Sequence, residues 1–418
     1  MVIFLFFTFF GFNSLGQMQS LSSEAAIASK ELLPLYHQFH QNPELSLKEE
    51  QTGSLLAQSL EKEGMKVTFP FAGTGVVGVF QNGPGKTVLL RADLDALPIT
   101  ENTALAFASK KTGVMHACGH DIHMTNLVGT VRLLIKNKQK WRGTLIAIGQ
   151  PAEEVGRGAK NMIAAGLLKK FPKPDYAIAF HVDSHLPAGT LGYVSGPVMA
   201  AADSVDVVIR GKGGHGALPQ ENIDPIVIAS RFVMDLQTLI SREREPTEPS
   251  VVSVGKFQCG TKHNITPESC QLELTVRSFD RTERKRLLEG IRRKAEASAL
   301  SSSAPKPSVE FSKEGTGATF NDPQLTQKVI DILEKQFGKK VLIPSKPATV
   351  SEDFSVYGDS GIPAVLLFLG SVSEKRLSKL SSQGKLPSLH SPEYYPDAEE
   401  TLAFGIQFMS SMVEGLLK

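Results

Sequence analysis

The chain has little of what marks several common protein classes. Its 418 residues include 45 Lys and Arg and 43 Asp and Glu, so the formal net charge is only +2. No continuous basic stripe is present, and the Lys/Arg-rich stretch 281–294 is interleaved with Glu and Leu, as on the solvated face of a helix. We therefore expect no nucleic-acid partner.

Long hydrophobic runs are equally scarce. The longest begins the chain, MVIFLFFTFFGF, and is too short to span a bilayer as a mature helix. Small residues follow at Ser14 and Gly16, which predicts a secretory signal peptide at 1–16 with cleavage before Gln17, although no Lys or Arg precedes the run. An uncleaved N-terminal anchor is the alternative. We expect an exported protein, periplasmic or extracellular, with no membrane contact once the signal is removed.

Cysteine occurs only three times, at Cys118, Cys259 and Cys270. An odd count in an exported chain leaves one thiol unpaired. A metal-bound thiolate at Cys118 would account for it. Cys259 and Cys270 would then either pair across a turn or remain ordinary buried thiols.

The densest group of chemically active side chains lies in the stretch MHACGHDIH, residues 115–123. A thiolate at Cys118 and an imidazole at His120 can reach one metal ion or two adjacent ones. Two alternatives are a buried Cys and His at a strand-to-helix turn, and a Cys nucleophile beside a His. For the flanking His116 and His123 we expect a supporting or surface role.

Acidic and histidine side chains also follow three predicted buried strands, 87–92, 144–149 and 176–180. Asp93 and Asp95 follow the first, Glu153 and Glu154 the second, and His181 the third. Open α/β sheets place their sites at the carboxyl ends of strands. We therefore expect these side chains to converge at one edge of a sheet.

The pattern of elements changes near residue 200. Strand, helix, strand, strand, helix and strand are predicted at 204–211, 225–241, 250–257, 269–279, 281–299 and 308–312. This is the split βαβ order of a small α+β domain. Because helices and a strand of the earlier kind return afterwards, the small domain is predicted to be inserted into the larger one.

Seven motifs then occur in order: HQNPELS, RADLDALP, MHACGHD, QPAEE, GGHGALP, SEDFS and LHSPEYY. Together they resemble the bacterial and plant branch of the aminoacylase/carboxypeptidase family of two-metal amidohydrolases. That branch includes N-acyl-amino-acid amidohydrolases, hippurate hydrolases and auxin-conjugate hydrolases. The resemblance implies an α/β, metallopeptidase-like catalytic domain with a central mixed sheet flanked by helices, in two parts at 17–198 and 314–418. The inserted α+β domain at 199–313 would serve as a lid or dimerisation domain.

The resemblance also implies roles for ten residues, carried over motif by motif. Two divalent ions, Mn, Zn, Co or Ni, would be held by a bridging Cys118 with His120, Glu154, His181 and His390. Glu153 would be the catalytic carboxylate, Asp95 would support the site, and His215 would reach the reacting carbonyl. Asn264 and Arg277 would hold the polar end of the substrate. One departure is NITP at 264–267, where NVIP is more usual.

We therefore expect an amidohydrolase that cuts the amide of an N-acyl amino acid or a similar small conjugate. A dipeptidase or carboxypeptidase of the same family is one alternative, and a catalytically silent solute-binding protein on this scaffold is another. In dimeric relatives the small domain pairs with its twin and its histidine enters the partner's active site. The resemblance thus implies a homodimer in which His215 acts on the other chain.

Overall fold

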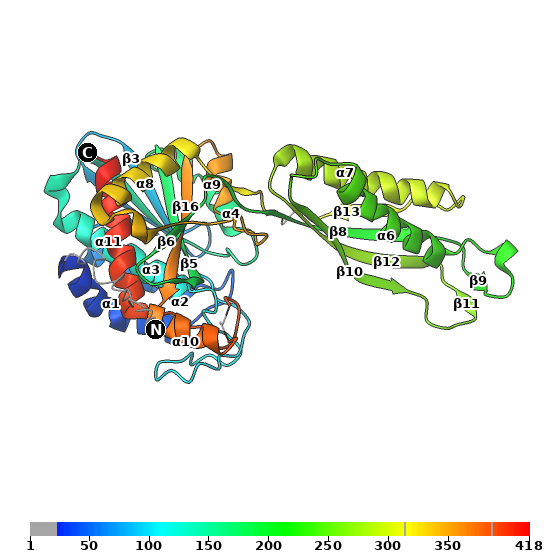
Figure 1. Ribbon diagram of the computed structural model, residues 1–418, viewed down its shortest axis with the longest axis horizontal. Coiled ribbons are helices and arrows are strands. Elements are labelled where there is room, and N and C mark those ends of the chain that lie inside the picture. The colour runs from blue at the N-terminus through cyan, green and yellow to red at the C-terminus, as the bar shows by residue number, and fades with distance from the viewer. Residues whose placement is uncertain (1–22, 313–314, 386–387) are drawn as a thin grey trace, which may run out of the picture.

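The protein folds into two lobes joined by two crossings of the chain (Figure 1). The computed structural model describes residues 23–312, 315–385 and 388–418, so the predicted signal peptide lies outside the described residues. The large lobe is built on an eight-stranded mixed sheet of order β1-β2-β4-β3-β5-β16-β6-β15. These strands are β1 Lys66–Phe71, β2 Gly75–Asn82, β3 Thr87–Asp93, β4 Gly143–Gln150, β5 Tyr176–Pro187, β6 Leu191–Tyr193, β15 Leu342–Pro344 and β16 Ala364–Val372.

The centre of this sheet is parallel and buried on both faces. Strand β3 runs parallel to β4 and β5, and β16 runs parallel to β5. Val88 and Leu90 pack into one hydrophobic cluster, and the intervening Leu89 packs into another. Continuous apolar runs therefore form these strands, because helices cover both faces of the sheet.

The helices divide between the two faces according to these clusters. The helices α1, α2, α3, α8 and α11 share the first cluster, and α4, α5 and α9 lie over the second. Their bounds are α1 Ser23–Gln41, α2 Glu50–Lys62, α3 His120–Lys136, α4 Gly158–Ala164, α5 Leu167–Lys170, α8 Pro323–Phe337, α9 Ser355–Asp359 and α11 Ala398–Leu416. A further helix, α10 Glu374–Ser382, contributes no buried residue. The predicted mixed sheet flanked by helices is confirmed.

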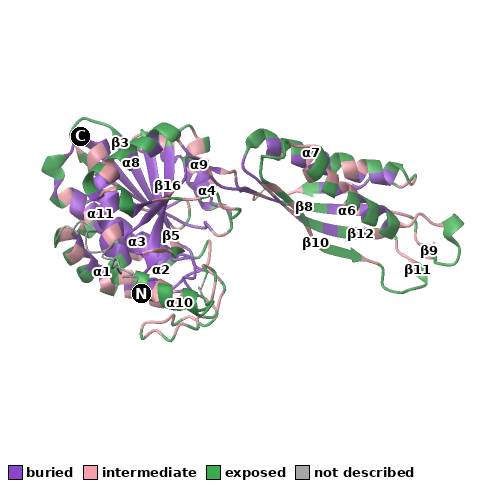
Figure 2. Ribbon diagram, viewed as in Figure 1, coloured by how far each residue is buried: buried purple, intermediate pink, exposed green. Residues whose placement is uncertain are grey.

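The small lobe is a four-stranded antiparallel sheet of order β10-β12-β8-β13, with two helices packed on one face. Its elements are β8 Ala201–Arg210, α6 Pro225–Arg242, β10 Ser250–Cys259, β12 Ser269–Ser278, α7 Arg281–Leu300 and β13 Ser308–Phe311. Side chains of α6 and α7 pack with alternate residues of β8 and β12 to form a separate core. Figure 2 shows how little of the outer strand β10 is buried.

Short paired strands complete each lobe. Strand β7, Gly196–Met199, pairs with β14, Thr319–Asn321, where the chain leaves and re-enters the large lobe. Strand β9, Gly214–His215, pairs with β11, Ile265–Thr266, at the far end of the small lobe (Figure 1). Among the described residues, no helix combines the length and hydropathy needed to cross a membrane.

Candidate active site

The predicted edge of the sheet does bring the acidic and histidine side chains together. Asp93 ends β3, and the loop that carries Glu153 and Glu154 follows β4. The position of His181 within its strand differs from the prediction. Strand β5 does not end at residue 180, because it pairs with β16 as far as Pro187. The His181 side chain therefore projects from within a strand, a firmer support than a loop.

The turn before α3 places Cys118 and His120 next to β5. Gly119 between them has φ +80°, and a Cβ there would lie 2.5 Å from Cγ2 of Val182. Only glycine tolerates both the left-handed backbone and this close approach. The turn thus sets the thiol of Cys118 and the first imidazole of α3 close beside β5.

His390 comes from the opposite end of the chain. Its backbone N–H donates to the carbonyl of Ala117 at 2.9 Å, and its φ of +64° is unusual for a residue with a side chain. Such left-handed conformations persist where the surroundings hold them, and they concentrate at functional sites. The contact brings His390 to within 3.3 Å of the Cys118 sulfur, measured from Nε2.

Cys118 lies at the junction of two groups of three donors. One group is Cys118, His120 and His181, and the other is Cys118, Glu154 and His390, each with donor atoms within 4.8 Å of one another. Thiolate, imidazole and carboxylate are the donors that zinc, manganese, cobalt and nickel accept. One sulfur shared between two triads is the arrangement that a bridged pair of ions requires.

Hydrogen bonds aim the imidazoles at this point. Nδ1 of His120 contacts the carbonyl of Asp95 at 2.8 Å, and Nδ1 of His181 contacts the carbonyl of Val182 at 2.9 Å. Each carbonyl can only accept, so the proton lies on Nδ1 and Nε2 keeps its lone pair. Within the described residues, the buried Nε2 of His120 and Oε1 of Glu154 have no hydrogen-bond partner. These unsatisfied atoms fit ligation of divalent ions.

Asp95 ties the loops of the site together. Its carboxylate accepts from the hydroxyl of Ser46 at 2.6 Å and from the backbone N–H of Glu154 at 2.9 Å. Together with its carbonyl contact to His120, these bonds connect three segments that are distant in sequence. Asp95 thus contacts one member of each triad, His120 and Glu154, without joining either.

Burial sets the direction of the pKa shift for four groups of the site, whereas for His120 the nearby Asp93 and Cys118 outweigh burial and raise the pKa well above 6.5. Burial raises the pKa of Cys118 well above the ordinary thiol value and the pKa of Glu154 to about 7. Burial lowers the pKa of His181 to about 4, which leaves a neutral imidazole. Burial, followed by repulsion from Glu352 and Glu154, holds the pKa of Glu153 well above 4.5. Such sites take up divalent cations with loss of the thiol proton.

A buried charge network beneath the site was missed by sequence reasoning. Arg91 donates to Asp93 at 2.6 Å, to Glu352 at 2.7 and 3.2 Å, and to Asp353 at 3.2 Å. Asp93 in turn contacts Nδ1 of His123 at 2.6 Å. The motifs RADLDALP and SEDFS contain Arg91, Asp93, Glu352 and Asp353. Charged residues inside these two motifs were the signal in the sequence that pointed to the network.

The two flanking histidines are both buried. His123 receives the N–H of Val182 at Nε2, 2.9 Å away, in addition to its contact with Asp93. This agrees with a supporting role and excludes a surface one. His116 is only 2% exposed, so the surface alternative is wrong for His116 as well. Neither of its ring nitrogens has a hydrogen-bond partner among the described residues.

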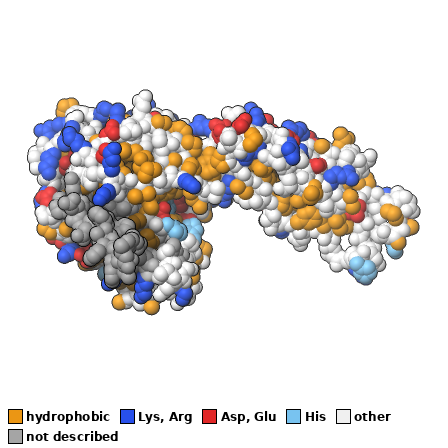
Figure 3. Space-filling model, in the orientation of Figure 1, with side chains coloured by type: hydrophobic (Ala, Val, Ile, Leu, Met, Phe, Trp, Pro, Cys, Tyr) orange, Lys and Arg blue, Asp and Glu red, His pale blue; other side chains and the backbone are white. Residues whose placement is uncertain are grey.

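The three predicted small-domain residues separate into two places. Arg277 lines a cavity of about 390 Å³ together with Glu153, Glu154 and His390. His215 and Asn264 are exposed at the far end of the small lobe, where the N–H of Gly216 donates to the carbonyl of Asn264 at 2.9 Å. Figure 3 shows histidine at both places, next to acidic side chains near the junction of the lobes and again at the far end. One chain alone does not bring His215 to the triads.

Comparison with known proteins places this architecture in a family. Residues 89–415 match the model of peptidase family M20/M25/M40. The chain is 38% identical over 349 residues to thermostable carboxypeptidase 2 of Saccharolobus solfataricus, covering 82% of this chain and 87% of that protein. It is 36% identical over 385 residues to IAA-amino acid hydrolase ILR1-like 4 of Arabidopsis thaliana, covering 91% of this chain and 84% of that protein.

A solved structure supports the same assignment. The YXEP protein of Bacillus subtilis, a dinuclear metal-binding peptidase, superposes with a TM-score of 0.78 at 30% identity, covering 94% of this chain and 99% of that chain. The fold and site define a metal-dependent hydrolase of amide bonds. The chain belongs to peptidase family M20/M25/M40.

Proposed function

We propose that this protein hydrolyses the amide bond of N-acyl amino acids or similar small conjugates, with Cys118, His120, Glu154, His181 and His390 holding two divalent ions. The observation that carries the proposal is the position of Cys118 in both donor triads. When bound, the ions would supply Lewis acidity to the scissile carbonyl and to the attacking water. The thiolate and imidazoles favour Zn, Co, Ni or Mn over Mg or Ca.

Glu153 would move the proton in this reaction. It lies beside Glu154 with donor atoms within 4.8 Å of His120, yet it belongs to neither triad that contains Cys118. Its raised pKa suits a carboxylate that takes a proton from water and returns it to the leaving nitrogen. Glu153→Gln should therefore lower kcat by roughly 10²–10⁴-fold, the usual range for general acid–base help, while metal content stays unchanged.

Arg277 would bind the carboxylate of the substrate's amino-acid part. Its side chain has no ion-pair partner in the part of the chain that the structure describes, although it lines the same cavity as Glu153. A guanidinium left free in a cavity is suited to a carboxylate through paired hydrogen bonds. The C-terminal carboxylate of a dipeptide would fit equally, so a dipeptidase or carboxypeptidase activity is the second candidate.

A homodimer would complete the site with His215 of the second chain. The N–H of Ala217 donates to Nδ1 of His215 at 3.0 Å, so the exposed Nε2 carries the proton and can donate to an oxyanion. Strand β10 is the outer strand of its sheet. Val227 and Met234 on α6 and Phe257 on β10 are 53%, 70% and 42% exposed. Two-fold pairing would cover this edge and these apolar side chains.

Export is proposed on separate grounds. Cys259 and Cys270 are joined by a disulfide, a bond that oxidising compartments sustain. The predicted signal peptide at 1–16 is consistent with such a compartment. Protein recovered from its host should then begin near Gln17.

A metal and substrate panel tests the catalytic proposal. Chelated protein should be inactive, regain activity with Mn, Zn, Co or Ni, and bind about two ions per chain, as two triads sharing one sulfur imply. N-acetyl, N-benzoyl and indole-acetyl amino acids compared with dipeptides would separate amidohydrolase from peptidase activity. Full activity without metal, lost on alkylation of Cys118, would instead favour the Cys nucleophile.

Mixing two inactive variants tests the dimer. His215→Ala and Glu153→Gln chains, exchanged at equal amounts, form about half mixed dimers with one intact site each, so activity should approach roughly a quarter of wild type. A thoroughly exchanged mixture that remains inactive would show that His215 does not act on the partner chain.

A further inference from the structure

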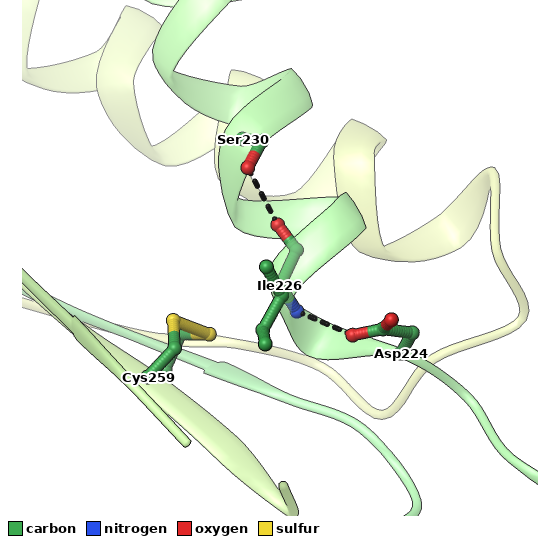
Figure 4. The surroundings of a disulfide bond; sticks show 5 residues. Asp224, Ile226, Ser230 and Cys259 are labelled. Carbon is green, nitrogen blue, oxygen red and sulfur yellow. Dashed lines mark hydrogen bonds between the residues drawn. A yellow bond between two sulfur atoms is a disulfide. The ribbon is translucent and has the colours of Figure 1, made fainter. Parts of the chain in front are cut away.

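The Cys259–Cys270 disulfide lies at the boundary between the packed small lobe and the exposed segment that carries His215. The two cysteines are opposed in the final register pair of β10 and β12, with their Cα atoms 4.5 Å apart. Figure 4 shows the bond beneath the first turn of α6, near Ile226. Residues 260–269 lie between the two cysteines and contain Asn264, β11 and the first residue of β12, Ser269; we call this segment the 260–269 loop.

The hydrophobic core of the small lobe ends at this bond. Cys270 is buried in the core formed by α6, α7 and the sheet, and Cys259 packs against it. From Gly260 to Ile265 every residue of the loop is exposed. This exposed part of the loop has no apolar packing to hold it. The loop is attached through the strand ends at its base, through the pairing of β11 with β9, and through the hydrogen bond from the Gly211 N–H to the Glu268 carbonyl at 2.8 Å.

The position of His215 depends on this loop. Its strand β9 pairs only with β11, in the register Ile265 with His215 and Thr266 with Gly214. The His215 carbonyl also accepts hydrogen bonds from the side-chain amide of Asn222 and from the N–H of Leu218, each at 2.9 Å. A displacement of β11 would therefore displace the imidazole.

We propose that Cys259 and Cys270 are positioning residues, whose disulfide holds the 260–269 loop so that His215 is presented in a fixed geometry to the partner's active site. The inference rests on the proposed function of His215. Closing the loop at its base removes the alternative arrangements that an open hairpin end would sample. Precise placement matters because a shift of about 1 Å in a catalytic group can cost roughly 10²-fold in rate.

The test is the double variant Cys259→Ser/Cys270→Ser, assayed as the metal-loaded full-length protein. Its kcat should fall by about 10- to 100-fold, whereas KM, set by Arg277, and metal content should change little. Hydrogen exchange should accelerate in peptides that cover 212–218 and 260–269. The control variant, Gln258→Ser/Gln271→Ser, alters the neighbouring opposed pair and should leave kcat unchanged.

Reduction of the wild-type protein provides a second route that requires no mutation. A phosphine reductant is oxidised to the phosphine oxide with the oxygen of one water molecule. The two sulfurs of the disulfide each take one proton of that water and become thiols. The loss of kcat should match that of the double variant and should be reversed by reoxidation. The double variant treated in the same way should show no further loss, which separates this effect from any reaction at Cys118.

Combination with His215→Ala identifies the pathway of the effect. If the disulfide acts through His215, removing it in the His215→Ala background should cause almost no additional loss of the residual rate. An equal fold-loss in both backgrounds, or a double variant with normal kcat, would overturn the positioning role while leaving the proposed function intact. Wild-type activity in His215→Ala would instead overturn the proposed role of His215 and this inference with it.

Discussion

Replacement of Arg91 by Met should destabilise the large lobe strongly, because it leaves a group of carboxylates buried without their cation. The Arg91 side chain has no solvent exposure and contacts Asp93, Glu352 and Asp353 at 2.6, 2.7 and 3.2 Å. Removing one partner of a buried ion pair typically costs about 3–5 kcal/mol. This is a large part of the roughly 5–15 kcal/mol that stabilises an ordinary domain.

The loss should also depend on pH, with a sign that follows from Asp353. Burial raises the pKa of Asp353 from 3.8 to about 7, although Arg91 opposes the rise. A carboxyl with a raised folded-state pKa contributes stability that is present below 3.8 and is lost as pH rises through about 7. Without Arg91 the pKa of Asp353 would rise further. The loss of stability caused by Arg91→Met should therefore be larger at pH 8.5 than at pH 5.5.

Urea unfolding of chelated protein at the two pH values provides the assay. Trp141 is the only tryptophan, and it is buried in the large lobe, so its fluorescence reports unfolding of that lobe. Arg210→Met removes an exposed arginine from the small lobe and should change stability by no more than about 0.5 kcal/mol. A loss for Arg91→Met below about 1 kcal/mol at pH 8.5, or one that is equal at both pH values, would refute the reasoning.

Three further predictions concern a buried histidine, the substrate carboxylate and the N-terminus. Burial alone would lower the pKa of His40, but hydrogen bonds with Asp121 and Glu101 raise it to about 9. The stability that this shift contributes is present below pH 6.5 and is lost as pH rises through 9. His40→Gln should therefore lower the free energy of unfolding by about 3 kcal/mol at pH 6 and by far less at pH 10. Arg277→Gln should raise KM by roughly 10- to 100-fold for substrates with a free carboxylate, and much less for their amides, as loss of a charge-assisted hydrogen bond implies; steady-state kinetics on matched substrate pairs would decide. N-terminal sequencing of exported protein should find Gln17 first, and soluble cytosolic protein with an intact Met1 would contradict export.

The parts of the fold and site that follow from local pattern were predictable from the sequence. Continuous apolar runs predict buried strands. Because β3 and β4 are parallel, residues that follow them, such as Asp95 and Glu154, lie at the same edge of the sheet. The shared position of Cys118 in two triads is a different matter. It depends on His390, 272 residues away in sequence, and only the resemblance to a family connected the two.

The Arg91 network shows why buried charge is hard to predict from sequence. Arg91 follows three apolar residues in β3, and although its partner Asp93 is only two residues away, its partner Glu352 is 261 residues distant. A lone arginine in such a strand signals that compensating carboxylates must exist, because an unpaired buried charge is very costly. The pattern does not say which of the 43 acidic residues supplies them. The pairs of Arg91 with Glu352 and Asp353 are fixed by tertiary contacts alone.

The placement of His215 marks a different limit, since even the complete fold of one chain does not give it a role. Its motif predicts a histidine that reaches a carbonyl, yet the small lobe holds it exposed at the end remote from the triads (Figure 1). Arg277, at the near end of the small-lobe sheet, already lines the cavity that contains Glu153 and His390, whereas His215 lies at the far end of the small lobe (Figure 1). We propose that two chains paired along β10 would allow each cavity to contain its own Arg277 and the partner's His215. The need for both groups at one substrate is the physical reason to expect the second chain.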